Sequence, residues 1–135
     1  MANLWLCFSV ILSSTILLSS AGIPGGPINI DPNTPEVQEA ARYALTVYNQ
    51  KSENANLYKI VKIQSAQSQV VAGVKYTMVV EMGLTQCKKG STDNAASCSL
   101  LNTSGQTLVC TFVVLEQAWI NVRSLLDSSC TPSGQ

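Results

Sequence analysis

The stretch TPEVQEAARYALTVYNQ, residues 34–50, has the pattern of an amphipathic helix. Thr34 can cap this helix, Pro35 suits its first position, and Glu36 lies in the first turn, where the helix dipole favours an anion. Six apolar side chains recur at a spacing that places them on one helical face: Val37, Ala40, Ala41, Ala44, Leu45 and Tyr48. Because three of the six are alanines, that face can lie close against a sheet. The polar residues 51–56 are expected to end the helix.

Strand patterns dominate the chain after this helix. Residues 58–66 indicate a strand, and in residues 74–85 apolar side chains alternate with polar ones, so one face of that strand belongs to the core. Residues 108–115 form a continuous apolar strand, and residues 120–126 a last one. One helix followed by four strands with short links predicts an α+β fold, in which an antiparallel sheet packs around a single helix. A single domain is the natural count for a chain of 135 residues.

The first 30 residues contain none of the eight basic and eight acidic residues of the chain. Residues 1–21 predict a secretory signal peptide, although its usual basic start is absent, and we expect cleavage after Ala21. A membrane anchor is the weaker interpretation, because Ser13-Ser14-Thr15 interrupts a run that is already short of the roughly 20 apolar residues that a membrane helix needs. The mature domain, residues 22–135, is then secreted and holds no membrane segment. It begins with an arm rich in Gly, Pro and Asn, residues 22–33, which we expect to be flexible.

Loss of the signal peptide would remove Cys7 and leave an even set of four cysteines: Cys87, Cys98, Cys110 and Cys130. In an oxidising compartment, four cysteines in a small domain predict two disulfides. Pairing in chain order, Cys87 with Cys98 and Cys110 with Cys130, is one of three possible connectivities. The predicted arrangement of the strands assumes this pairing. A zinc site is a weak alternative because the gaps between these cysteines contain no Cys-x-x-Cys, so we expect no metal and no cofactor. Asn102-Thr103-Ser104 matches the sequon for N-glycosylation.

Charge and composition exclude several functions. The net charge is zero, and a nucleic-acid-binding protein would need a basic surface to displace counterions. The chain has no histidine, which excludes Ser-His, Cys-His and HExxH mechanisms. An enzyme that uses paired carboxylates, such as Glu81 with Glu116, would survive this test. The acidic residues are spread singly along the chain and are better interpreted as solvated surface residues, so we do not expect an enzyme.

Two hairpin links carry apolar residues where polar ones are usual: Val70-Val71 in the first link and Ala118-Trp119 in the second. One interpretation is that these side chains fold back onto their own strands as additional core. The other is that both links lie at one end of the sheet and, with the N-terminal arm, form an apolar edge that fits a groove. Tryptophan is enriched among the residues that anchor binding interfaces.

These residues carry a resemblance to a known family. Gln69-Val70-Val71-Ala72-Gly73 resembles the Gln-x-Val-x-Gly loop of the cystatins, Gly25-Gly26-Pro27 resembles their N-terminal glycine segment, and Trp119 resembles their second-loop tryptophan. Tyr48-Asn49 at the helix end and the four cysteine positions are similar to the secreted, two-disulfide branch. The resemblance covers essentially the whole mature chain.

The resemblance implies reversible, tight inhibition of papain-like cysteine proteases of the cathepsin L or B type by a three-part wedge. The implied contact residues are Ile23, Pro24, Gly25, Gln69, Val70, Val71, Ala72, Gly73, Ala118 and Trp119. Gly25 would mark the point at which the arm leaves the substrate path. The protein would act as a monomer, with a domain-swapped dimer through the first link as a further possibility. The alternative is a secreted module that keeps this fold and binds something else.

Two positions depart from the family pattern. Ala118 stands where the family usually has proline, which implies a less rigid second loop and an affinity loss of about 0.5–1 kcal/mol. Some members also inhibit legumain through an Asn that follows a Ser after the helix. Here Glu53 follows Ser52, and Asn54 comes one place late, so this second activity is not predicted.

Overall fold

The computed structural model describes residues 26–101 and 107–133 of the chain. The expected signal peptide, the predicted contact residues Ile23, Pro24 and Gly25, and the sequon at Asn102 lie outside the described residues. The elements in chain order are β1 (Ile28–Ile30), α1 (Pro35–Lys51), β2 (Asn56–Val71), β3 (Gly73–Lys88), the 3₁₀ turn η4 (Ala95–Ser97), β4 (Thr107–Gln117), the 3₁₀ turn η5 (Ala118–Ile120) and β5 (Val122–Pro132). Within these ranges no helix is long and apolar enough to cross a membrane.

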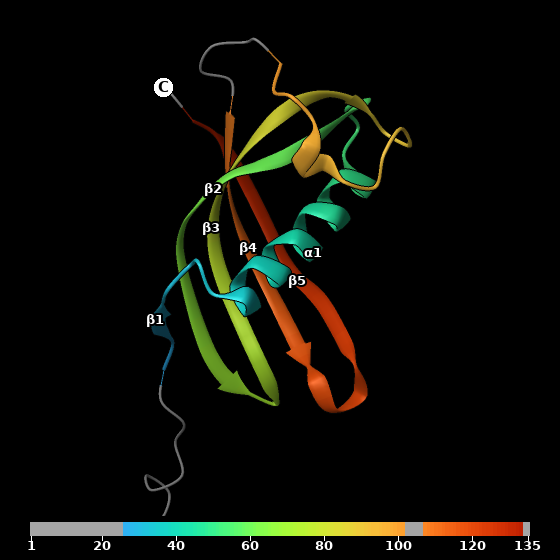
Figure 1. Cartoon of the computed structure of the whole chain (residues 1–135). Helices are drawn as coiled ribbons and strands as arrows, with labels where there is room; N and C mark the ends of the chain where they lie inside the picture. The colour runs from blue at the N-terminus through green and yellow to red at the C-terminus, as the bar shows by residue number, and fades with distance from the viewer. Residues whose placement is uncertain (1–25, 102–106, 134–135) are drawn as a thin grey trace, which may run out of the picture.

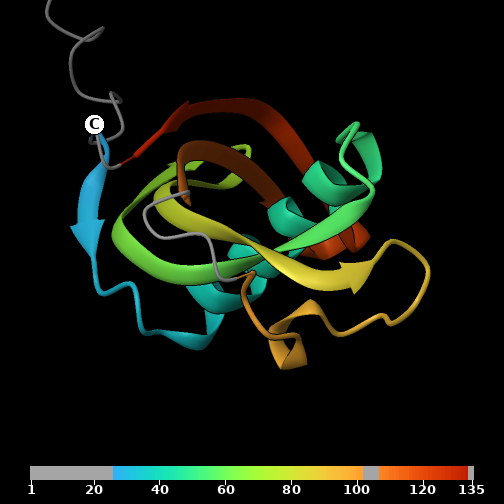
Figure 2. The same cartoon turned by 90° about the horizontal axis from the view of Figure 1, so that it is seen from above.

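The strands form one antiparallel sheet with the order β1-β2-β3-β4-β5. The sheet curves around α1, which lies across its inner face (Figures 1 and 2). Register shifts between β2 and β3, at Ile60/Lys62 and Ile63/Ser65, are the kind of bulge that bends a strand and lets a sheet curve. The predicted α+β fold, an antiparallel sheet around one N-terminal helix, is therefore confirmed.

The predicted helix and its buried face are present. Thr34 caps α1 by accepting a hydrogen bond from the Val37 amide, and Pro35 is the first helical residue. Five of the six apolar positions are buried, and Tyr48 is half-buried with its ring edge against Tyr58 and Phe112. The opposite side of the core is supplied by alternating side chains of β3 and by β4: Tyr76, Met78, Val80, Met82, Cys110, Phe112 and Val114.

Asn49 joins the end of α1 to the sheet. Its side chain is buried, donates a hydrogen bond to the Tyr58 carbonyl at 3.0 Å and accepts one from the Tyr58 amide at 2.9 Å. This two-way bond gives both backbone groups of Tyr58 a side-chain partner and holds the first residues of β2 against the helix.

Both disulfides form in chain order, Cys87 with Cys98 and Cys110 with Cys130. Cys110 and Cys130 are direct partners in the β4–β5 ladder, so this bond clips the last two strands together. The bond between Cys87 and Cys98 closes the segment that follows β3 and contains η4. The expected pairing is thus confirmed.

Three expectations about element boundaries were wrong. Within the arm expected to be flexible, residues 28–30 form β1, because their backbone pairs with β2 at Ile28↔Ser68 and Ile30↔Ala66. The first link is only Ala72, because its other residues continue the β2 and β3 ladder. The last strand begins at Val122 and not at residue 120, because Asn121 adopts a left-handed conformation with φ 54° that ends η5 and interrupts the extended chain.

Candidate functional site

Two hairpin tips lie next to each other at one end of the sheet, as Figure 1 shows at the free ends of β2–β3 and β4–β5. The reason is the register of the central pair, in which Val74 lies opposite Glu116. This pairing places Ala72, the turn of the first hairpin, beside Gln117, which precedes η5. The Gln117 side-chain amide donates a hydrogen bond to the Ala72 carbonyl at 3.3 Å. The structure therefore brings both predicted loops together on one edge.

The apolar side chains on this edge point to solvent. Exposed fractions are 68% for Val70, 41% for Val71 and 65% for Trp119. Ala72 and Ala118 are also exposed, whereas Gln69 and Gly73 are half-buried at the base of the turn. The interpretation that these loops fold back as additional core does not hold. An exposed apolar surface of several neighbouring side chains is typical of an interaction site.

The turn of the first hairpin requires glycine at position 73. Gly73 has φ +121°, a conformation that residues with a side chain rarely adopt. A Cβ atom at this position would lie 2.5 Å from the Glu116 carbonyl oxygen of the neighbouring hairpin. The close approach of the two tips therefore depends on the missing side chain.

The direction of strand β1 places the residues before it on the side of the same edge. It runs antiparallel to β2, with Ile28 opposite Ser68. Residues that precede Ile28 consequently extend toward Gln69 and Val70, so Pro27 and Gly26 point toward the hairpin tips. The remaining predicted contacts of the arm, residues 23–25, lie outside the described residues.

Sequence reasoning missed several residues that shape the second loop. Ile120 is 54% exposed and extends the apolar surface beside Trp119. Glu116 and Arg123 flank the loop as cross-strand partners and form an ion pair of 2.7 Å. The sequence did contain a signal for this ion pair, because an acidic and a basic residue on either side of a predicted hairpin link favour a cross-strand pair.

Glu116 and Glu81 do not form the carboxylate pair that a glycosidase-like enzyme would need. Glu81 lies opposite Val109 and Glu116 lies opposite Val74, so seven residues along β3 separate them. This separation is roughly 24 Å, whereas paired carboxylates that cleave glycosidic bonds lie about 5–10 Å apart. Among the described residues there is also no group of three or more His, Cys, Asp or Glu side chains that could hold a metal ion.

The base of the edge contains a tyrosine with a shifted pKa. Burial raises the pKa of Tyr76, and the carboxylates of Glu116 and Glu36 raise it further, while Arg123 lowers it. Tyr76 therefore keeps its proton at any pH at which the protein would act.

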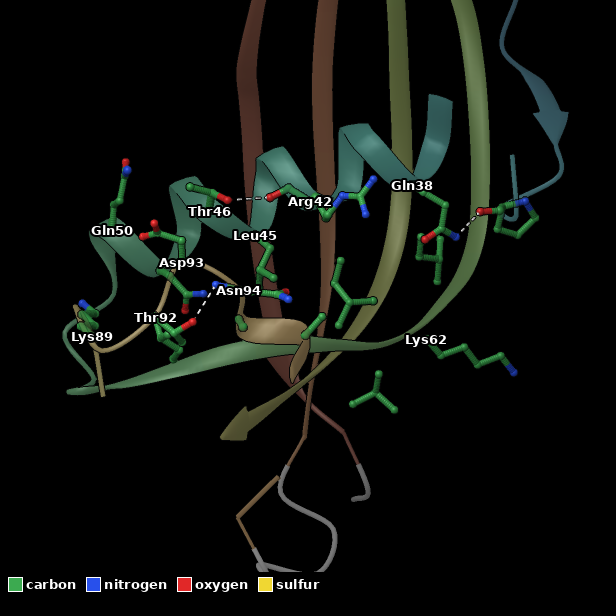
Figure 3. A pocket seen from close by; sticks show the side chains of 18 of the residues that line it. Gln38, Arg42, Leu45, Thr46, Gln50, Lys62, Lys89, Thr92, Asp93 and Asn94 are labelled. Atoms are coloured by element: carbon green, nitrogen blue, oxygen red, sulfur yellow. Dashed lines mark hydrogen bonds between the residues drawn. The ribbon is translucent and has the colours of Figure 1, made fainter. Parts of the chain in front are cut away.

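A cavity of about 1020 Å³ lies elsewhere, between α1, β2 and the segment 89–96 (Figure 3). Leu45 points into it from the helix, whereas the Lys62 side chain extends away from it. None of its lining residues belongs to the two hairpin tips. The candidate site therefore lies outside this cavity, on two exposed hairpin tips at the end of the sheet (Figure 1).

The fold and this edge define a class of protein: a small disulfide-bonded domain that presents two adjacent apolar hairpin tips on a rigid sheet. A model of the cystatin domain matches residues 25–119. The chain is 37% identical to Cystatin-2 of Crotalus adamanteus over 131 residues, covering 94% of this chain and 96% of the relative. It is 36% identical to Cystatin of Gallus gallus over 108 residues, covering 78% of this chain and 77% of the relative.

A solved structure agrees with these sequence relatives. Dimeric human cystatin F superposes with a TM-score of 0.74 at 31% identity, covering 88% of this chain and 96% of that chain. The chain belongs to the cystatin family. Members of this family are cysteine protease inhibitors and not enzymes, and the membership supports the same general activity for this protein.

Proposed function

We propose that this protein is a secreted, reversible, tight-binding inhibitor of papain-like cysteine proteases of the cathepsin L or B type. The observation that carries the proposal is the exposed apolar edge, in which Val70, Val71 and Trp119 project from two hairpin tips that touch each other. The two tips project from the end of the sheet (Figure 1), and the active site of a papain-like protease is a cleft.

In this proposal the first tip, with Val70, Val71 and Ala72, fills the cleft beside the catalytic cysteine. Trp119 covers the primed side of the cleft, next to Ala118. Both tips are held on paired strands before binding, so little conformational entropy is lost when the protease docks. Burial of the apolar side chains then supplies most of the affinity, which agrees with a net charge of zero.

The N-terminal arm is the third part of the wedge. Ile23 and Pro24 lie in the non-primed subsites, and Gly25 turns the chain away from the catalytic thiolate. Glycine serves this turn because it adopts backbone conformations that other residues avoid. The direction of β1, which points residues 26 and 27 toward the hairpin tips, supports this role for the preceding residues.

The test is a titration of papain with the mature protein, residues 22–135, produced by secretion so that both disulfides form. We expect one inhibitor molecule to block one protease molecule, with full recovery of activity after dilution. The substitution Gly25→Glu is expected to weaken inhibition without changing the unfolding temperature. No inhibition of papain or of a cathepsin L type protease at micromolar concentration would refute the proposal.

Secretion has a separate test. Expression of the full chain in a eukaryotic cell should release a protein whose first residue is Gly22. Retention of the uncleaved chain in the cell would contradict the predicted signal peptide without affecting the proposed inhibition.

A further inference from the structure

The second hairpin loop is exposed and has few internal restraints. It consists of the short turn η5, whose cap is a single backbone bond from the Asn121 amide to the Ala118 carbonyl at 3.1 Å. Ala118 lacks the ring by which a proline would fix its own φ, so the residue before Trp119 keeps the ordinary range of backbone conformations. Contacts outside the loop can therefore contribute to the orientation of Trp119.

One ion pair joins the side chains of the two strands at the base of this loop. Glu116 and Arg123 lie directly opposite each other in the β4–β5 ladder. The Arg123 Nε atom donates to Glu116 Oε2 at 2.9 Å, and its Nη2 atom lies 2.7 Å from the same oxygen. Two donors from one planar guanidinium fix its orientation as well as its distance.

Arg123 also connects this hairpin to the helix. Its Nη2 atom lies 3.6 Å from Glu39 Oε2, and its guanidinium carbon lies 6.0 Å from the centre of the Tyr43 ring. Glu39 and Tyr43 belong to α1, so one side chain joins β4, β5 and the helix. The exposed fractions of the Arg123 and Glu116 side chains are 33% and 25%, so water screens this pair only in part.

We propose that the Glu116–Arg123 pair, braced by Glu39 and Tyr43 of α1, positions the second loop and thereby sets the orientation of Trp119. Arg123 and Glu116 are positioning residues, because they act through the loop and not by touching the protease. Gln117, next to Glu116, connects the second loop to the first tip by donating a hydrogen bond to the Ala72 carbonyl. The consequence for inhibition rests on the proposed function, whereas the order of the loop does not.

The order of the loop can be measured in the free protein. Trp119 is the only tryptophan in residues 22–135, because the other one is Trp5. Time-resolved fluorescence anisotropy therefore reports the motion of this one side chain. In Arg123→Gln we expect the amplitude of the fast, local decay to rise about twofold, since a pair of this kind holds two side chains in one geometry. Lys62→Gln, which removes an exposed positive charge on β2, is the matched control and should leave the decay unchanged.

The second measurement is the rate at which the complex with papain dissociates. Glu116→Gln should raise this rate about threefold, and Arg123→Gln should raise it at least as much because it also removes the contacts with Glu39 and Tyr43. The double variant should raise the rate no further than Arg123→Gln alone, because the Glu116–Arg123 pair is already lost in that variant. Arg123→Lys, which keeps the charge and loses the two-donor geometry, should give an intermediate rate. In a Trp119→Ala background the same Arg123 substitution should leave the rate unchanged.

The outcomes separate the two proposals. An unchanged anisotropy decay in Arg123→Gln, or an equal rise in dissociation rate with and without Trp119, would overturn the positioning role. Absence of papain inhibition by the unsubstituted protein would refute the proposed function, while the anisotropy of the free protein would still decide whether the pair orders the loop.

Discussion

The carbonyl oxygen of Glu116 lies 2.5 Å from the place where a Cβ atom of residue 73 would be, so the second hairpin packs against the bare backbone of the first. This contact brings the two tips close enough for the Gln117 amide to reach the Ala72 carbonyl. The two tips can approach this closely because residue 73 is glycine.

Gly73→Ala should lower the free energy of unfolding by about 2–3 kcal/mol, because the new methyl group meets backbone and the φ of +121° is strained for alanine. Gly90→Ala is the control, since its φ is +84° and nothing lies within 4 Å of an added Cβ. That substitution should cost only about 1 kcal/mol. Urea unfolding measures both, and equal losses would contradict the close-approach argument.

Trp119→Ala should weaken papain inhibition by about 2–3 kcal/mol, or roughly 30- to 150-fold, as expected for a tryptophan anchor. The unfolding temperature should not change, because the side chain is 65% exposed. Leu126→Ala removes a side chain that is 53% exposed on β5, away from the tips. It should leave inhibition as it is, and a comparable loss in this control would argue against the predicted contact surface.

Asn49→Ala should lower the free energy of unfolding by about 2–3 kcal/mol, because it leaves the amide and the carbonyl of Tyr58 without their partner. Asn49→Asp keeps the acceptor and loses the donor, so this substitution should also lower the free energy of unfolding. Asn54→Ala, at an exposed turn nearby, is the control. Thermal unfolding of the three variants would show whether this bond holds α1 to β2.

Removal of the disulfide Cys110–Cys130 by a double alanine substitution should cost about 3 kcal/mol of stability. Removal of Cys87–Cys98 should cost about 0.5 kcal/mol less by chain entropy, because its sequence separation is 11 residues and not 20. Denaturant unfolding of the two double variants tests this order, and a peptide map without reduction should recover both pairs.

Stability should fall at alkaline pH because the pKa of Tyr76 is raised by burial. The unfolded chain releases the phenol proton near pH 10, whereas the folded chain holds it to a higher pH. The free energy of unfolding should therefore be constant with respect to this group below pH 10 and decrease above it. In Tyr76→Phe the decrease should be shallower, and an identical pH profile would contradict the assigned shift.

The helix and the core strands followed from local pattern, whereas the cysteine count left three disulfide connectivities open and the structure shows pairing in chain order. The helical spacing from Val37 to Tyr48 and the alternation from Val74 to Leu84 each indicate one apolar face that packs in the core. In the structure most side chains of both faces are buried. The resemblance to the cystatins could also be recognised from the sequence alone, because the motifs from Gly25 to Trp119 stand in the family's order. Strand β1 was not predictable, since Ile28–Ile30 gains its structure only by pairing with residues 36 to 40 positions further along the chain, Ala66–Ser68.

The amino-acid sequence by itself determined which side chains are apolar, where the helix begins, and which residues compose the two tips. Only the tertiary structure decided that the tips touch, that Val70 and Trp119 point to solvent, and that Arg123 joins the second hairpin to Glu39 of the helix. The physical reason is that these relations depend on the register between β3 and β4 and on the curvature of the sheet. Both are set by contacts between residues far apart in the chain, which no local pattern encodes.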